Sequence, residues 1–397
     1  MSVLIVGGDN HLKKDQYLKS VRDISLDHPT LLKVQILRAK CRNPLCQKKS
    51  FILPNSNVSK YARATDRLKR EALDSIVLDN ISTLRTSRRM RRSYNTTGSK
   101  SSIDRWKHQE ADRYEFKEII SHLEFSGILS LDDYKPLRSS SYDLFASDAK
   151  TGKILYLETQ GVSQGRGKVV KFLETIKGFG LKPWAIVFDL WSAFPKSVQK
   201  VFPGILIQYD HFHVMNQIHR YLKNALLQFR RQLKEAGLKD LQEEIWQHKW
   251  RLLKNMDRWT PQDHFIIEDL MKVYRGTVVE KVLLFKECLF QLFNNVQSRQ
   301  EAFQKRDELY EQTWWRSSWH LTKVMQLLMS PKFPYMLTYL DYPDLPRAGN
   351  SETLIRTWRQ IERVRYGFKT QKGKQNHLKL YQIKYYLNDH FIRNTEK

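Results

Sequence analysis

Between residues 127 and 210, short apolar runs alternate with turn signals in a pattern that predicts β-strands. The predicted strands are 127–134, 142–148, 152–159, 183–190 and 204–210. The Thr151–Gly152 step marks a hairpin, and helical patterns at 168–180 and 192–202 separate the later strands. Three strands joined by short turns, followed by alternating helices and strands, predict a mixed α/β sheet.

Residues 211–345 have a helical pattern throughout and are rich in tryptophan. We interpret this tryptophan stripe as the core of a helical bundle, with base-stacking platforms as the alternative. Its members are Trp246, Trp250, Trp259, Trp314, Trp315 and Trp319. A last helix is expected near Ser351, and it leads into a basic tail at 368–382.

Residues 56–113 read as three short, basic helices. The first is expected to start at Ser56 or Asn57 and to run to residue 78, with apolar residues on one face. The second covers 81–95, and the third covers 103–113 with Trp106 as its apolar anchor. A polar break before the third helix predicts a helix-turn-helix, and a basic, solvated linker is the alternative. The apolar positions of the first helix are Leu68, Ala72, Leu73, Ile76 and Val77.

The first 55 residues combine a strand-like run at 31–38 with Cys41 and Cys46, which flank an Asn-Pro turn like one knuckle of a zinc ribbon. A structural zinc site needs four ligands, so these cysteines supply half of one. His11 and His28 could complete the set, but their spacing matches no known motif. Two free thiols beside a turn are the interpretation that we favour.

The charge balance narrows the choice of partner. The chain has 397 residues, with 68 Lys and Arg against 42 Asp and Glu, for a formal net charge of +26. Such an excess predicts a polyanionic partner, which is usually nucleic acid, and charge alone leaves ribosomal and membrane-surface roles as alternatives. With three cysteines and no long apolar run, the sequence favours a reduced, intracellular protein without a membrane segment.

Two carboxylates follow predicted strands, Asp132 after the first and Asp189 after the fourth. Adjacent strand ends meet at one edge of an α/β sheet, so the pair is expected to converge there. Carboxylates suit Mg²⁺ or Mn²⁺, and paired metals of this kind catalyse attack at a phosphodiester. Such a site needs a third carboxylate, usually from a helix packed on the sheet.

In its strand order and in these acids, the chain resembles the RNase H-like DDE transposases, and in particular the ISL3 family of insertion sequences. That family has an N-terminal zinc ribbon, a helix-turn-helix, and a catalytic core interrupted by a large helical insertion. The resemblance implies the following division: 1–55 a degenerate zinc-ribbon-like segment, 56–115 the helix-turn-helix region, 122–214 the first part of the core, 215–345 the insertion, and 346–397 the end of the core with a basic tail.

Four local matches carry the resemblance. The first two matches are the strand that ends at Asp132 and the strand that ends at Asp189. Asp133 is an alternative to Asp132 as the catalytic residue. In the third, a strand followed by Asp210 and His213 resembles a near-site element of many such transposases. The fourth begins at Glu352 and continues at the family's offsets with Arg359, Arg363, Tyr366, Gly367 and Phe368. Ile355 stands where the family often has Asn.

The resemblance implies a metal-dependent transposase with catalytic and metal-binding residues Asp132, Asp189 and Glu352. Two Mg²⁺ (or Mn²⁺) ions would support hydrolysis at the transposon end and then strand transfer to target DNA. We expect a homodimer on double-stranded DNA, both at the transposon ends and at the target. The expected location is the bacterial cytoplasm, at the nucleoid. Bound zinc is the less favoured alternative. The expected DNA contacts are Arg85, Arg88, Arg89, Arg91 and Arg92 to phosphates, Ser101, Ser102, Arg105 and Lys107 in the groove, and Lys369, Lys372 and Lys374 in the tail.

Two other functions share these features. A catalytically silent, domesticated transposase would keep the basic N-terminal module and bind DNA without needing the three acids. A structure-selective nuclease of the same fold would cleave without joining. Each acid also has a structural alternative: Asp132 can close a turn, Asp189 can cap a helix, and Glu352 can pair with a helix dipole. A strand-end cap of the following helix explains Asp210 nearly as well as a place near the active site.

Overall fold

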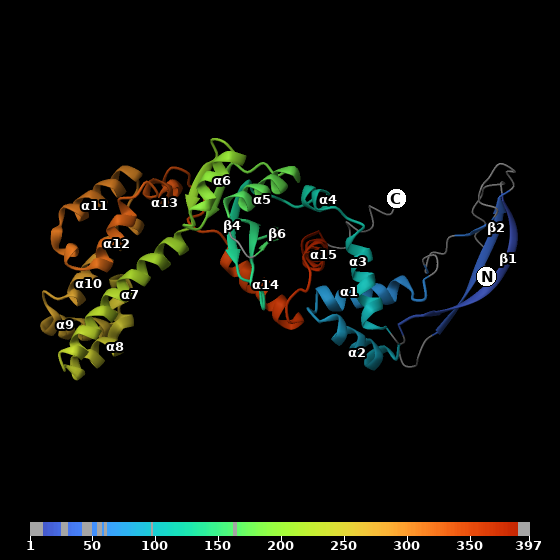
Figure 1. The fold of residues 1–397 in the computed structure, drawn as a ribbon, viewed down its shortest axis with the longest axis horizontal. Helices are drawn as coiled ribbons and strands as arrows, with labels where there is room; N and C mark the ends of the chain where they lie inside the picture. The colour runs from blue at the N-terminus through green and yellow to red at the C-terminus, as the bar shows by residue number, and fades with distance from the viewer. Residues whose placement is uncertain are drawn as a thin grey trace. The chain divides into compact units, whose positions relative to one another are not determined.

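The computed structural model describes residues 11–24, 31–41, 50–53, 58, 62–96, 98–161 and 165–387 (Figure 1). The chain divides into two compact units. The first holds the N-terminal residues to Leu123, the loop Lys135–Ser140 and the residues from Arg356 onward. The second holds Glu124–Tyr134 and Ser141–Ile355.

The second unit contains the predicted mixed sheet, and all of its predicted strands are confirmed. These are β4 (Ile128–Tyr134), β5 (Tyr142–Asp148), β6 (Ile154–Gly161), β7 (Ala185–Phe188) and β8 (Leu206–Tyr209). The spatial order is β6-β5-β4-β7-β8, with antiparallel pairs from β6 to β4 and parallel pairs from β4 to β8. The parallel strands need crossovers, which α5 (Arg166–Gly178) and α6 (Ala193–Val201) supply.

The strands β4 and β7 lie inside the sheet, where β7 is apolar throughout and β4 is mainly apolar up to Leu131. Ile128, Leu129 and Leu131 of β4 are buried, as is every residue of β7. A strand buried on both faces reads as a continuous apolar run, which explains why these strands were readable from the sequence.

The rest of this unit is helical and begins directly after β8. Its first helix, α7 (His211–Glu235), continues without a break through residues 214 and 215, where the sequence had suggested a boundary. The elements that follow are α8 (Lys239–Leu253), η1 (Met256–Arg258), α9 (Pro261–Tyr274), α10 (Val278–Asn294), α11 (Arg299–Glu311), η2 (Thr313–Ser317), α12 (Trp319–Leu328), α13 (Phe333–Met336) and η3 (Thr338–Leu340).

The expectation that the tryptophan stripe forms bundle core is wrong for half of its members. Trp315 is buried at 4 % exposure, but Trp246, Trp250 and Trp319 are 38 %, 63 % and 59 % exposed. The bundle core is filled instead by Leu, Ile, Val and Phe side chains, among them Phe285 and Phe293 of α10. The exposed tryptophans are therefore available at the surface of the helical region.

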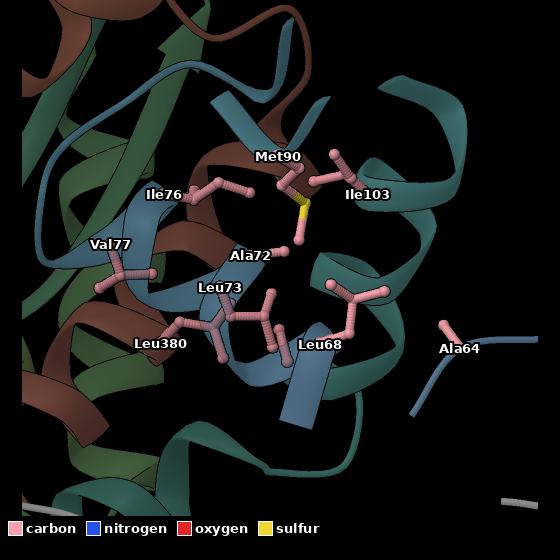
Figure 2. Packing of buried hydrophobic residues seen from close by; sticks show 10 residues of the cluster. Ala64, Leu68, Ala72, Leu73, Ile76, Val77, Met90, Ile103 and Leu380 are labelled. Carbon is pink, nitrogen blue, oxygen red and sulfur yellow. The ribbon is translucent and has the colours of Figure 1, made fainter. Parts of the chain in front are cut away.

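In the first unit, three helices pack around the predicted apolar face. They are α1 (Asp66–Val77), α2 (Thr83–Tyr94) and α3 (Lys100–Ala111). In Figure 2, Met90 of α2 lies among Ala72, Ile76 and Ile103. The first helix starts later than expected, because the Thr65 hydroxyl accepts a hydrogen bond from the Leu68 N–H at 3.1 Å and caps it there.

This unit also contains the antiparallel sheet β1-β2-β3 and the C-terminal helices. The strands are β1 (His11–Arg22), β2 (Leu31–Cys41) and β3 (Phe51–Ile52). The remaining helices are α4 (Phe116–Ser121), α14 (Ser351–Arg365), which begins in the second unit, α15 (Gln371–Gln382) and the π-helical η4 (Ile383–Leu387). Leu380 of α15 is part of the core around α1. Within the described residues, no helix combines the length and apolar character that crossing a bilayer requires.

Candidate active site

Three aspartates directly follow the last paired residues of the adjacent parallel strands β4, β7 and β8, although β4 itself continues past the first of them to Tyr134. Leu131 of β4 pairs with Phe188 of β7, and Phe188 pairs with Tyr209 of β8. The next residue along each chain segment is an aspartate: Asp132, Asp189 and Asp210. The predicted convergence of Asp132 and Asp189 at one edge of the sheet is therefore what the topology produces.

Asp132, Asp133 and Asp189 form a compact group of oxygen donors. One carboxylate oxygen from each lies within 4.8 Å of the others. Asp132 is buried and the other two are half-buried. Oxygen donors of this kind fit Mg²⁺, Mn²⁺ or a similar hard divalent cation. The donor set thus suits a divalent cation, and Asp133 belongs to it alongside Asp132 rather than in its place.

Burial makes two of these carboxylates, those of Asp133 and Asp189, hard to ionise. Burial, reinforced by the charges of Asp189 and Asp132, raises the pKa of Asp133 to about 7. Burial also raises the pKa of Asp189, against the hydrogen bond from the Trp191 N–H, which is donated at 2.9 Å. The group would therefore gain from a positive charge, which stabilises all three carboxylates in the ionised form.

His213 supplies one such charge from the first turn of α7. Its Nε2 lies 3.5 Å from the Asp132 Oδ2. Burial opposes protonation, but the hydrogen bond and charge of Asp132, with Asp210 and Asp189 nearby, raise the pKa of His213 to about 9. At neutral pH the imidazolium therefore partly neutralises the acidic group.

Asp210 acts as a cap and also fixes a distant segment. Its Oδ1 accepts a hydrogen bond from the Phe212 N–H at 2.8 Å, which caps α7 as the structural alternative proposed. Its Oδ2 accepts another from the Gly349 N–H at 2.9 Å. A Cβ at Gly349 would lie 2.1 Å from the Ser130 Oγ, so the close approach requires glycine.

The same segment reaches Asp132 two residues later. The Ser351 hydroxyl donates a hydrogen bond to the Asp132 Oδ2 at 3.0 Å, and both side chains are buried. Glu352 follows on the first turn of α14 and is half-buried. The structure therefore brings the start of α14 to the site, but it does not place the Glu352 carboxylate in the group formed by Asp132, Asp133 and Asp189.

Sequence reasoning missed the roles of Gly349 and Ser351. From the sequence, Ser351 is expected only to lie near the start of the last helix, and Gly349 has no expected role at the site. The close approach of Gly349 to Ser130 depends on a contact between β4 and the chain after the helical region. No local pattern signals such a contact.

The Tyr366–Gly367–Phe368 motif, which ends the match that begins at Glu352, has a structural role in the first unit. Tyr366 and Gly367 take positive φ angles of 57° and 86°, which end α14. The Gly367 N–H donates to the Glu362 carbonyl at 2.8 Å, and Phe368 stacks on the buried Trp358 with a ring-centroid distance of 5.7 Å. The aromatic-Gly-aromatic motif therefore closes the helix and returns the chain onto it.

Most of the expected DNA contacts lie at the surface of the first unit. The exposed members are Arg85, Arg88, Arg91, Arg92, Ser101, Arg105, Lys369 and Lys372. Two of the expected DNA contacts, Arg89 and Lys372, have intramolecular partners that compete with DNA. Arg89 forms ion pairs with Asp79 and Glu71, and Lys372 pairs with Asp112 at 3.0 Å. Ser102 is half-buried, and its hydroxyl shares a hydrogen bond with Ser99.

Two other members of that set point into the protein. Lys107 is buried, its ammonium donates to the Gly373 carbonyl at 3.2 Å, and burial lowers its pKa to about 8. Lys374 is also buried, on α15. The segment from Lys369 was expected to be a basic tail on DNA, but most of it forms a helix docked on α3. These two lysines are therefore not available as surface contacts.

The suggested zinc ligands are Cys41, Cys46, His11 and His28. Cys46 and His28 lie outside the described residues, as do the side chains of Cys41 and His11.

Comparisons with known proteins point to one family. The profile of the ISL3 family of DDE transposases, described as "Transposase", matches residues 129–374, which is more than half of the chain. No curated protein sequence matches. A solved structure titled "Drosophila P element transposase strand transfer complex" is similar at 10% identity and a TM-score of 0.41, covering 79% of this chain and 91% of that one. This similarity is too low to support an argument about function.

Proposed function

Because the chain belongs to the ISL3 family of DDE transposases, we propose that it is the DNA transposase of an insertion sequence. In this proposal it binds the terminal inverted repeats and hydrolyses a phosphodiester at each end, which leaves a 3′-hydroxyl. That hydroxyl then attacks a phosphodiester of the target DNA, which forms a new phosphodiester bond and releases a 3′-hydroxyl of the target. The register of Asp132 and Asp189 at adjacent strand ends is the observation that carries the proposal.

The proposed architecture is an RNase H-like core with a helical insertion. Three antiparallel strands followed by two parallel ones in the order β6-β5-β4-β7-β8 support this reading. The core is assigned to 122–214 and 346–397, the insertion to 215–345, the helix-turn-helix region to 56–115, and the zinc-ribbon-like segment to 1–55. The packing of α1, α2 and α3 around one core supports the helix-turn-helix assignment.

We assign the catalytic and metal-binding roles to Asp132, Asp189 and Glu352. Two divalent cations held there would activate the attacking hydroxyl and stabilise the leaving oxygen. Asp133 is a further ligand of the same site, since its carboxylate lies within the same group. Glu352 is carried by a segment that is hydrogen-bonded to Asp132 and Asp210, and it directly follows Ser351, which contacts Asp132.

The chain's own residues prepare this site. Protonated His213 holds Asp132 and offsets its charge until a cation is bound. Ser351 orients the Asp132 carboxylate through its hydroxyl, and Asp210 holds the start of α14 through the Gly349 N–H. None of these groups needs to form a covalent bond to DNA, because water and the 3′-hydroxyl are the nucleophiles.

DNA would contact the exposed basic face of α2 and the start of α3. Arg85, Arg88, Arg91 and Arg92 can pair with phosphates in a bidentate way, and Ser101 and Arg105 can reach a groove. Synapsis of two transposon ends would bring two copies of the chain together, so we expect a homodimer on DNA.

A joining assay tests the proposal. Purified protein is incubated with labelled DNA from the flanks of its own gene, with Mg²⁺, with Mn²⁺ or with neither. We expect metal-dependent nicked and joined products that disappear in Glu352→Gln and Asp189→Asn. Glu268→Gln, at an exposed position on α9, is the matched control and should retain activity.

Each other outcome would lead to a different conclusion about the protein's function or its metal ligands. Binding without cleavage under either metal would indicate a domesticated DNA-binding protein. Cleavage without joined products would indicate a nuclease. Products that survive Glu352→Gln but disappear in Asp133→Asn would move the third metal ligand from Glu352 to Asp133.

A further inference from the structure

The helical region contains a cavity that the proposed catalytic site does not use. Its volume is about 480 Å³, which lies in the range of ligand-binding pockets. It is formed between α7 and α12. The residues that line it are Asn224, Leu227, Gln228, Arg231, Trp319 and His320.

The lining residues have the chemistry that recognises a nucleotide. Asn224 and Gln228 lie one helical turn apart on α7, and each amide offers both a donor and an acceptor, as base edges do. Arg231 stands almost one turn further along and can pair with a phosphate. Trp319, at the start of α12, is 59 % exposed, so its ring can stack on a base.

The charge around the cavity favours an anionic ligand. Helix α7 carries five Lys and Arg residues and one acidic residue, Glu235, while α12 carries Lys323 and no acid. The Lys323 ammonium lies 5.2 Å from the Trp319 ring centroid. None of the residues that line the cavity is acidic.

A basic-aromatic patch adjoins the cavity on the other side of α7. We define it by Lys223 and Arg230 of α7 with Trp246, Lys249 and Trp250 of α8. Arg230 lies 4.5 Å from the Trp246 ring centroid, and Lys223 lies 5.5 Å from that of Trp250. Leu227 contributes to both the cavity and a hollow within the patch, so the two surfaces are continuous.

We propose that this cavity binds an unpaired nucleotide of the transposon-end DNA, with the base stacked on Trp319 and the adjoining backbone on the basic-aromatic patch. The inference rests on the proposed function, and it adds a second DNA site of different chemistry. Unpaired bases expose a π-face and their pairing edge, which this combination of tryptophan, amides and arginine can engage. Paired DNA offers neither to the cavity.

Fluorescence anisotropy with the full-length protein in the absence of divalent metal tests the proposal. One labelled duplex carries the terminal repeat fully paired, and a second adds a short unpaired flank. We expect the unpaired flank to strengthen binding about tenfold, in line with stacking energies of aromatic side chains. Trp319→Ala should abolish this preference without changing the affinity for the paired duplex, and Trp319→Phe should retain most of it.

Phe265→Ala is the control, because Phe265 is an exposed aromatic residue on α9 that does not line the cavity. Equal binding of both duplexes by the unmodified protein, or an undiminished preference in a folded Trp319→Ala protein, would overturn this inference alone. Failure to bind either duplex would overturn the proposed function as well. A 2-aminopurine in the flank, quenched in the unmodified protein and not in Trp319→Ala, would place the base at the tryptophan.

Discussion

The N–H of Gly349 donates a hydrogen bond to the Asp210 carboxylate across 2.9 Å, although the two residues are 139 positions apart in the sequence. Asp210 follows β8 as the N-cap of α7, and Gly349 lies just before α14. Between them lies nearly the whole helical region. Through this bond the sheet edge that holds Asp132 and Asp189 also holds the segment that carries Ser351 and Glu352.

Asp210→Asn should slow the reaction without removing the metal site. The amide keeps one acceptor for the Phe212 N–H but presents an NH₂ group to the Gly349 N–H, which leaves a buried donor unpaired. We expect a loss of about 1–3 kcal/mol in stability and a large fall in joining rate.

Calorimetric titration of Mn²⁺ distinguishes this positioning role from metal ligation. Manganese affinity should stay within a small factor of the unmodified protein's value, because Asp210 lies outside the group of three carboxylates. A strong loss of affinity would make Asp210 a ligand. Asp240→Asn, at an exposed position on α8, is the matched control.

Gly349→Ala should impair the site through steric overlap. The new Cβ would lie 2.1 Å from the Ser130 Oγ and 3.0 Å from the Ser130 Cβ, and Ser130 is buried. The start of α14 must therefore shift, and we expect joining activity to fall at least tenfold, since small misplacements near reacting groups have large effects on rate. Adding Ser130→Ala removes the closer overlap and should restore part of the activity.

Gly178→Ala is the control for that experiment, because a Cβ there meets no atom within 4 Å. It should leave the activity unchanged. If Gly349→Ala joined DNA as efficiently as the unmodified protein, the segment would not need its close approach to β4.

Binding of divalent cations should strengthen as the pH rises toward and through 7. Asp133 has a pKa of about 7, raised by burial and by its acidic neighbours, so below that pH the folded protein holds a proton where a cation would bind. Each pH unit below 7 should therefore weaken the affinity by about tenfold for one displaced proton.

Calorimetry of Mn²⁺ binding in buffers of different ionisation enthalpy measures the protons released. About one proton per Asp133 site should be released at pH 6, and this release should disappear in Asp133→Asn. An affinity that does not change between pH 5.5 and 7.5 would contradict the raised pKa.

Replacing Lys107 with methionine should stabilise the protein at neutral pH. Burial lowers the pKa of Lys107 from 10.5 to about 8, so the folded state resists the charged form that the unfolded chain prefers. The resulting loss of stability is complete below the folded-state pKa of about 8 and disappears as the pH rises to the unfolded-state pKa of 10.5. We expect a gain of about 1–2 kcal/mol at pH 7, allowing for the lost hydrogen bond to Gly373, and a smaller gain at pH 10.

Thermal unfolding of Lys107→Met and of Lys100→Met, an exposed position on the same helix, measures that difference. DNA binding gives a second check. Lys107→Met should bind DNA like the unmodified protein, whereas Arg105→Met should weaken binding. Loss of DNA binding in Lys107→Met would instead support the expectation that Lys107 contacts a DNA groove.

The sheet and its two aspartates could be predicted because the signals are local. Each central strand is an apolar run that ends in an acid, and the order of strands and helices determines which ends meet. The first-unit helices were also readable from their periodic apolar positions, although the Thr65 cap shortened α1.

Contacts between distant segments could not be read in this way. Lys107 and Lys374 look like surface cations until α15 packs against α3 and buries them. Trp319 resembles a core residue in the sequence because its side chain is large and hydrophobic. The sequence does not show which face of its helix is packed against the bundle. The placement of Ser351 against Asp132 depends on how the chain returns after the helical region.

The two ends of that helical region meet at its base. Besides the bond between Gly349 and Asp210, the His211 N–H donates to the Arg347 carbonyl at 2.9 Å. The entry and exit points are therefore joined directly to each other by these two hydrogen bonds. A short linker from His211 to Arg347 could replace the helices in an engineered minimal protein that keeps its carboxylates together, and other domains could be grafted at the same position.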